Sequence, residues 1–132
     1  MIVSYATVDD YALYADSSTI PADDLEKMLH KASRQIDSLT YNRIVAVGFD
    51  NLTDFQQGIV REVCCKLADF DYDNSDLLAS ALSSYSVNGV SMSFGGIAVT
   101  VISGVPISRE LYALLSQTGL CTGNLNWRHY QP

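Results

Sequence analysis

Basic residues are scarce in this sequence. Its 132 residues include eight Lys and Arg against fifteen Asp and Glu, which gives a formal net charge of -7 at pH 7. Tight, salt-dependent binding to nucleic acid needs clustered Lys and Arg that face phosphates. The charge balance therefore argues against a nucleic-acid-binding protein of that kind.

The start of the chain lacks both a basic stretch and a long apolar run. The opening segment, MIVSYATVDD, has neither the positive charge and apolar core of a signal peptide nor the length of a membrane span. We therefore expect neither segment, and we expect a protein that is made in the cytoplasm.

Cysteine is also rare, and the number of cysteines is odd. Cys64 and Cys65 are adjacent within an apolar helical pattern, and Cys121 lies alone near the C-terminus. Adjacent thiols in an odd-numbered set suit buried, reduced cysteines better than a disulfide framework.

The apolar content is sufficient for one folded domain. Hydrophobic residues make up 48% of the chain and charged residues 17%, as in ordinary globular proteins. We find no internal repeat, low-complexity tract or linker. The sequence predicts a helical domain over residues 1–120 and a C-terminal arm over residues 121–132, where CTGNLNWRHYQP has no period.

Capping signals and apolar periodicity predict helices in the first half of the chain. Thr7 to Asp10 is a capping box that opens a short helix to about Ala15. Pro21 takes the first position of a long helix. Its apolar residues recur at spacings of three and four: Leu25, Met28, Leu29, Ala32, Ile36 and Leu39.

A third helix is predicted from Thr53, whose capping-box partner is Gln56, to about Tyr72. The segment before it, Arg43 to Asp50, is predicted to be a loop that contains a short apolar run. The inner stripe of the third helix consists of Phe55, Ile59, Val63 and Leu67.

An alternation of period two replaces the helical pattern later in the chain and predicts a β-hairpin at about residues 86–103. Gly95-Gly96 supplies its turn, and Pro106 ends its second strand. Ser108 then caps a last helix that Gly119 closes. The fold class is therefore mainly α: a small helical bundle of about four helices, with a β-hairpin inserted before the last helix and an extended C-terminal arm.

Charge is distributed unevenly along the chain. Fourteen of the fifteen acids lie at or before Asp76, and the only charged residues from Leu77 to Pro132 are Arg109, Glu110 and Arg128.

The apolar face of the hairpin has two alternative roles, to cover the domain's own core or to pair with a neighbouring subunit. The candidate protein-interaction residues in the hairpin and arm are Val90, Met92, Phe94, Val99, Val101, Leu125, Trp127 and Tyr130.

The sequence predicts no catalytic, cofactor-binding or metal-binding residues. His30 and His129 lack any paired-ligand spacing, and Cys121 has no adjacent positive charge that would activate it toward His129. Alternate acids resemble calcium ligands, but the glycine and closing glutamate of an EF-hand are missing, so we expect a solvated helix end. These acids are Asp69, Asp71, Asp73 and Asp76.

Several segments follow one another along the chain in a specific order and spacing. The most specific is SYSVNGVSMSF, which leads through Pro106-Ile107-Ser108 into a helix that ends in TGL. The other segments are TVDDYALYA, PADDLEKMLHKASRQIDSLT, FQQGIVREVCCKLADF and SRELYALLSQTGL. Over about the first 120 residues, this order and spacing resemble those of the head-tail connector family of long-tailed bacteriophages and prophages.

The resemblance implies a structural virion protein without catalytic residues, placed at the head-tail interface and in the host cytoplasm before assembly. Such proteins form rings, of about twelve subunits when matched to a portal, and a ring needs two different complementary patches per subunit. The implied partners are further copies of the chain, the portal protein and a stopper or tail-completion protein. DNA passes through the channel without specific binding.

Two further questions stay open at the level of sequence. The acidity suits a channel in which DNA slides without sticking, and equally a subunit kept soluble before assembly. The alternative function is a small non-enzymatic adaptor module that binds one protein partner through its C-terminal tail, with Trp127 and Tyr130 as anchors.

Overall fold

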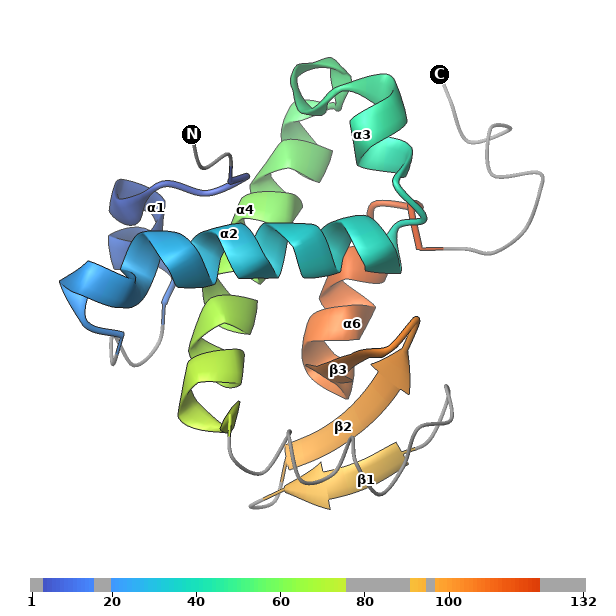
Figure 1. The fold of residues 1–132 in the computed structure, drawn as a ribbon. Helices are drawn as coiled ribbons and strands as arrows, with labels where there is room; N and C mark the ends of the chain where they lie inside the picture. Colours follow the sequence, from blue (N-terminus) through green and yellow to red (C-terminus); the bar gives the residue numbers. More distant parts are fainter. Residues whose placement is uncertain (1–3, 16–19, 76–90, 95–96, 122–132) are drawn as a thin grey trace.

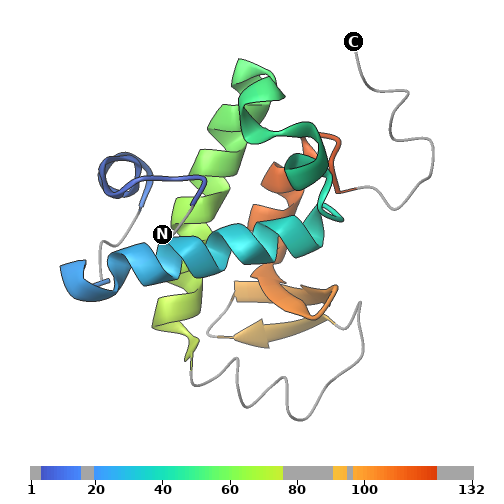
Figure 2. The same ribbon diagram turned by 45° about the horizontal axis from the view of Figure 1, so that its top comes forward.

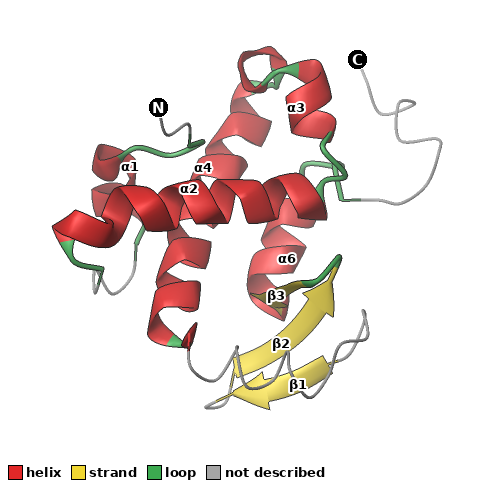
Figure 3. Cartoon of the chain, viewed as in Figure 1, coloured by secondary structure: helices red, strands yellow, loops and turns green. Residues whose placement is uncertain are grey.

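The protein is mainly helical, with a small antiparallel sheet directly before the last helix, as the sequence predicts (Figures 1 and 3). The structure is a computed structural model that describes residues 4–15, 20–75, 91–94 and 97–121. Its elements are the helices α1 (Val8–Tyr14), α2 (Ala22–Leu39), α3 (Arg43–Val47), α4 (Asp54–Asp73) and α6 (Arg109–Ser116), the 3-10 turn η1 (Phe49–Asn51), and the strands β1 (Ser91–Phe94), β2 (Ile97–Ile102) and β3 (Val105–Ser108).

The predicted caps form as reciprocal hydrogen bonds. At the start of α1, the Asp10 amide donates to Thr7 Oγ1 over 3.1 Å, and the Thr7 amide donates to Asp10 Oδ2 over 2.9 Å. Thr53 and Gln56 make the same pair of bonds at the start of α4. Each capping box provides partners for amides that the first helical turn leaves unpaired.

The core lies where α2 crosses α4. Figure 2 shows, from a second direction, that α2 lies across α4 and reaches toward α6. Both helices bury one face there, and burial of each large aliphatic side chain contributes roughly 1.5–3 kcal/mol. The buried side chains of this crossing include Leu29, Ile36, Leu39, Val60, Val63, Cys64 and Leu67.

Two details of the predicted helices are wrong. Phe55, assigned to the inner stripe of α4, is 60% exposed because it lies in the first turn, beyond the region that α2 covers. The predicted loop from Arg43 to Asp50 contains α3 and η1. Left-handed backbone at Tyr41 and Asn42 reverses the chain after α2, so that a short helix begins at Arg43.

The hairpin forms with the predicted turn position, because Phe94 pairs with Ile97 across Gly95-Gly96. The expectation that Pro106 ends the second strand is wrong. β2 ends at Ile102, and Pro106 lies within β3, which adds a third strand in the order β1-β2-β3. A proline is tolerated in an edge strand, where its missing N–H needs no ladder partner. The link from β2 to β3 is the pair Ser103 and Gly104, both with positive φ, as tight hairpin turns require.

The sheet packs onto the helices through β2 and β3. All four residues of β3 are buried, and the strand contacts α2, α4 and α6. The strands gather at one end of the helical part, from which α6 runs back beside α4 in the opposite direction (Figure 1). This arrangement sets α4 and α6 side by side.

Candidate interaction site

The structure places the predicted interaction residues in different situations. Val99 and Val101 are 0% and 2% exposed, so their side chains belong to the domain's own core, the first of the two roles considered for the hairpin face. Val90, Leu125, Trp127 and Tyr130 lie outside the described residues. Met92 and Phe94 have described backbone in β1, and their side chains lie outside the description.

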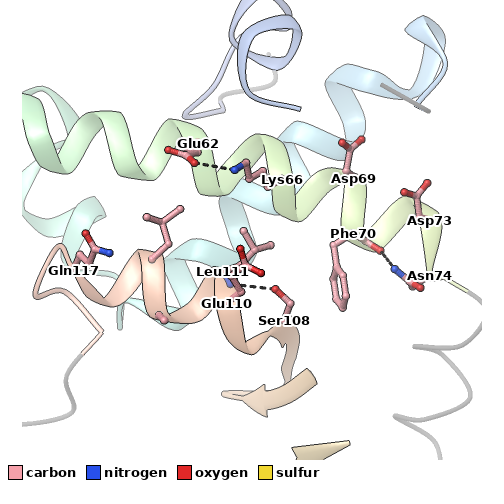
Figure 4. Close-up of a pocket in the computed structure, with 12 residues that line it drawn as sticks. Glu62, Lys66, Asp69, Phe70, Asp73, Asn74, Ser108, Glu110, Leu111 and Gln117 are labelled. Atoms are coloured by element: carbon pink, nitrogen blue, oxygen red, sulfur yellow. Dashed lines mark hydrogen bonds and ion pairs between the residues drawn. The ribbon is translucent and has the colours of Figure 1, made fainter. Parts of the chain in front are cut away.

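A groove lies between α4 and α6 (Figure 4). It has a volume of about 680 Å³. The lining side chains come from α4, from the residue that follows it, and from Ser108 and α6. They are Glu62, Lys66, Asp69, Phe70, Asp73, Asn74, Ser108, Glu110, Leu111, Ala113, Leu114 and Gln117.

Hydrogen bonds fix the two helices that form the groove. Gln56 Nε2 donates to the Thr118 carbonyl over 3.0 Å, which ties the start of α4 to the end of α6. At the opposite end, Ser108 Oγ accepts the Leu111 amide over 3.1 Å and caps α6. Leu111 and Leu115 turn inward, so the outer side of α6 is left to form a wall of the groove.

The rim of the groove is mostly acidic. Glu62, Lys66, Asp69 and Asp73 follow one another at spacings of four, three and four residues, which places them on one face of α4. Glu110 adds a carboxylate from α6. Lys66 Nζ donates to Glu62 Oε2 over 2.9 Å. Four carboxylates and one lysine therefore leave the groove with a negative charge.

Asp69 also connects the groove to α1. The hydroxyl of Tyr11 donates a hydrogen bond to Asp69 Oδ1, and the Ile20 amide donates to the same hydroxyl over 3.4 Å. Burial, and next the hydrogen bond to Asp69, raise the pKa of Tyr11 to about 12. The hydroxyl therefore stays protonated at neutral pH and keeps its role as donor.

Apolar side chains form the floor of the groove. Phe70 and Leu111 are buried and Leu114 is half-buried, whereas Ala113 is exposed. An acidic rim around an apolar floor suits a peptide segment that carries both aromatic or aliphatic side chains and a positive charge.

The solvated helix end that we predicted from the acids near the end of α4 is only partly correct, because Asp73 is exposed but two other acids are buried. Asp69 and Asp71 are only 7% and 3% exposed. Residues two apart on a helix point to nearly opposite sides, so Asp69 faces α1 while Asp71 faces α2. Asp76 lies outside the described residues. Among the residues described here, no group of His, Cys, Asp and Glu could hold a metal ion.

Asp71 is buried against α2, and its interactions there do not fully offset the cost of burying its charge. Burial raises its pKa to about 6, while Lys31 and the amide of Gln35 act in the opposite direction. Within the described part of the chain, Asp71 Oδ2 and Gln35 Oε1 have no hydrogen-bond partner. Both atoms are acceptors in their usual state, and a proton on Asp71 Oδ2 would turn that atom into a donor.

The three cysteines are free and buried, as predicted. Burial raises the pKa of Cys64 to about 11, of Cys65 to about 12 and of Cys121 to about 11. Thiols with such values are protonated at neutral pH and react slowly as nucleophiles. His129, the conceivable partner of Cys121, lies outside the described residues.

Sequence reasoning missed the groove, although one signal for it was present. The face formed by Glu62, Asp69 and Asp73 can be read from their spacing, but its position beside α6 depends on the tertiary fold.

No helix in the described ranges is long and apolar enough to cross a membrane. No family model, no curated protein and no solved structure was found to match this chain.

Proposed function

We propose that this chain is a structural virion protein, a head-tail connector or adaptor of a long-tailed bacteriophage or prophage. It forms a ring under the portal, extends the DNA channel and joins the head to tail components. The observation that carries the proposal is the element order: a long helix α2, a second long helix α4, a hairpin, and a short capped helix α6. This is the order of the sequence segments on which the resemblance rests.

The distribution of polar and apolar surface supports an assembly role. The described surface offers an acidic groove with an apolar floor. The arm over residues 121–132 adds Leu125, Trp127 and Tyr130, large side chains of the kind that anchor protein interfaces. Two dissimilar surfaces per subunit are what a ring of identical subunits requires.

The charge supports passage of DNA rather than binding of DNA. Most acids lie in the helical first half of the chain, where α1, α2 and α4 expose many of them. A negative channel wall repels phosphates and lowers the affinity for DNA that has to slide past it. The protein partners of the proposal are further copies of the chain, about twelve in a ring, with the portal on one side and a stopper or tail-completion protein on the other.

Electron microscopy of the full chain with and without purified portal rings tests the proposal. We expect rings or a ladder of oligomers at high concentration, or a ring that forms only on the portal, because a portal can template subunits that are monomeric alone. A chain that stays monomeric and ignores the portal would contradict the proposal. Binding of one protein at a 1:1 ratio through the tail would favour the small adaptor module instead.

A further inference from the structure

We propose that the groove between α4 and α6 receives residues 122–132 of the C-terminal arm of a neighbouring copy of the same chain. This inference rests on the proposed function, since it supplies the contact that would join subunits in a ring. It assigns one occupant to the groove, and it gives the arm a binding site on a defined part of the fold.

The dimensions of the groove suit a short extended segment. The lining residues of α4 and its C-cap run from Glu62 to Asn74, a length of about 18 Å at 1.5 Å per residue. An extended chain rises by about 3.3 Å per residue, so about five residues fill the groove. Residues 122–132 of the arm exceed that number.

The chemistry of the arm is complementary to that of the groove. The groove has carboxylates of Glu62, Asp73 and Glu110 along its rim and Phe70 and Leu111 in its floor. The arm contains no acid, and its Arg128 and His129 are the only basic side chains that follow Glu110 in the sequence. These two residues lie between Trp127 and Tyr130, so apolar and basic side chains come together in one segment.

A second basic segment of the chain fits the groove less well. Lys27, Lys31 and Arg34 lie exposed on one face of α2. Arg34 already pairs with Asp37 of the same helix over 3.0 Å. This face offers charge without the large apolar side chains that the floor of the groove would bury.

The position at which the chain leaves the domain favours a neighbouring copy over the same copy. Arg43 Nη1, in α3, donates to the Leu120 carbonyl over 3.1 Å, which holds the end of the domain on the side of α3. The described lining of the groove contains no residue of α2 or α3, and α2 passes behind α4 and α6 where the groove faces the viewer (Figure 4). The arm therefore starts next to α3, an element that contributes no described lining residue to the groove.

An arm that leaves one copy and binds the groove of the next copy links the two copies. Such a contact is heterologous, because the two surfaces that meet are different. Repetition of one heterologous contact closes a ring when the rotation per subunit permits closure. A portal ring would act as a template for this contact, because the portal would hold neighbouring subunits at the separation that the arm has to span.

A charge-reversal experiment on the full chain tests the inference. Glu110→Lys should weaken assembly on portal rings by about tenfold, the effect of one lost charge pair. The combined variant Glu110→Lys with Arg128→Glu should recover most of that loss. Asp54→Lys is the matched control, because Asp54 is also an exposed acid in the first turn of a helix and lies away from the groove.

Circular dichroism and thermal unfolding show that each variant is folded before its assembly is compared. Equal assembly of Glu110→Lys and Asp54→Lys would overturn the inference. Recovery of Glu110→Lys by Lys27→Glu, in place of Arg128→Glu, would assign the groove to the basic face of α2 and would overturn it as well.

Disulfide trapping separates a neighbouring copy from the same copy. One population of the full chain carries Ala113→Cys in the groove, and a second, tagged to a different mass, carries Asn126→Cys in the arm. After mixing, assembly and oxidation, we expect a disulfide that joins chains of the two masses. Assembled rings without that disulfide would overturn the inference and leave the proposed function standing. Failure to form any ring, with or without portal, would instead contradict the proposed function.

Discussion

The hydroxyl of Tyr11 in α1 donates a hydrogen bond to the carboxylate of Asp69 in α4. This contact attaches a helix of only seven residues to the longest helix of the fold. It also holds Asp69 at the edge of the groove that we propose as a subunit contact. The packing of α1 is thereby coupled to the geometry of one wall of the groove.

Removal of this hydroxyl should destabilise the domain. Tyr11→Phe keeps the buried ring but leaves the Asp69 carboxylate without its donor, which should lower the free energy of unfolding by about 1–3 kcal/mol. Urea denaturation measures the change. Tyr14→Phe, in the same helix and with a half-buried ring, is the matched control. Equal effects of the two substitutions would show that the bond between Tyr11 and Asp69 contributes little.

Asp71 should make stability fall as the pH rises from about 4 to about 6. Its pKa is raised to about 6 in the folded state, above the value of about 3.9 expected in an unfolded chain. The folded state therefore binds more protons in this range, and the free energy of unfolding decreases until Asp71 is ionised in both states.

Asp71→Asn removes this titration. The variant should be more stable than the parent by roughly 1–3 kcal/mol at pH 7 and about equally stable at pH 4. Urea denaturation at both pH values gives the comparison, with the exposed Asp50→Asn as control. A variant that is less stable than the parent at pH 7 would show that the ionised carboxylate is satisfied in solution.

Two glycine-to-alanine substitutions should have opposite effects. Gly104 has a φ of +77° in the turn between β2 and β3, and an alanine there should cost about 1 kcal/mol. Gly58 lies within α4, and a Cβ at that position meets nothing within 4 Å. Gly58→Ala should therefore stabilise the domain by about 0.5–1 kcal/mol. Thermal unfolding measures both, and a stabilising Gly104→Ala would contradict the turn that connects β3.

The three thiols should react slowly with a maleimide in the native protein. Their burial and raised pKa values leave little thiolate at pH 7. Mass spectrometry of labelled peptides distinguishes the three positions, and the urea-unfolded chain serves as the reactive control. Rapid labelling of Cys121 alone would show that the end of the domain, where the arm begins, opens independently of the core.

Local signals in the sequence predicted the helix starts and the hairpin. Thr7 and Thr53 carry their capping partners within three residues, and Gly95-Gly96 fixes which residues pair across the turn. The short helix α3 was missed because five residues are too few to show a period. β3 was missed because the edge position that tolerates Pro106 is set by the tertiary fold.

The candidate site was less accessible to sequence reasoning than the fold. The burial of Asp71 follows from the crossing of α2 over α4, a contact between distant parts of the sequence. The groove needs α6 beside α4, which depends on how β2 and β3 return the chain to the helices. The alternation that contains Val99 and Val101 left open whether their apolar face is exposed, and the structure buries both side chains.

The central claim is that the chain assembles as a ring on a portal. The most direct measurement is electron microscopy of the full chain mixed with purified portal rings, with mass photometry to count the bound subunits. We predict a ring of about twelve copies, coaxial with the portal and continuous with its channel. Portal rings that remain bare at every concentration of a correctly folded chain would contradict the claim.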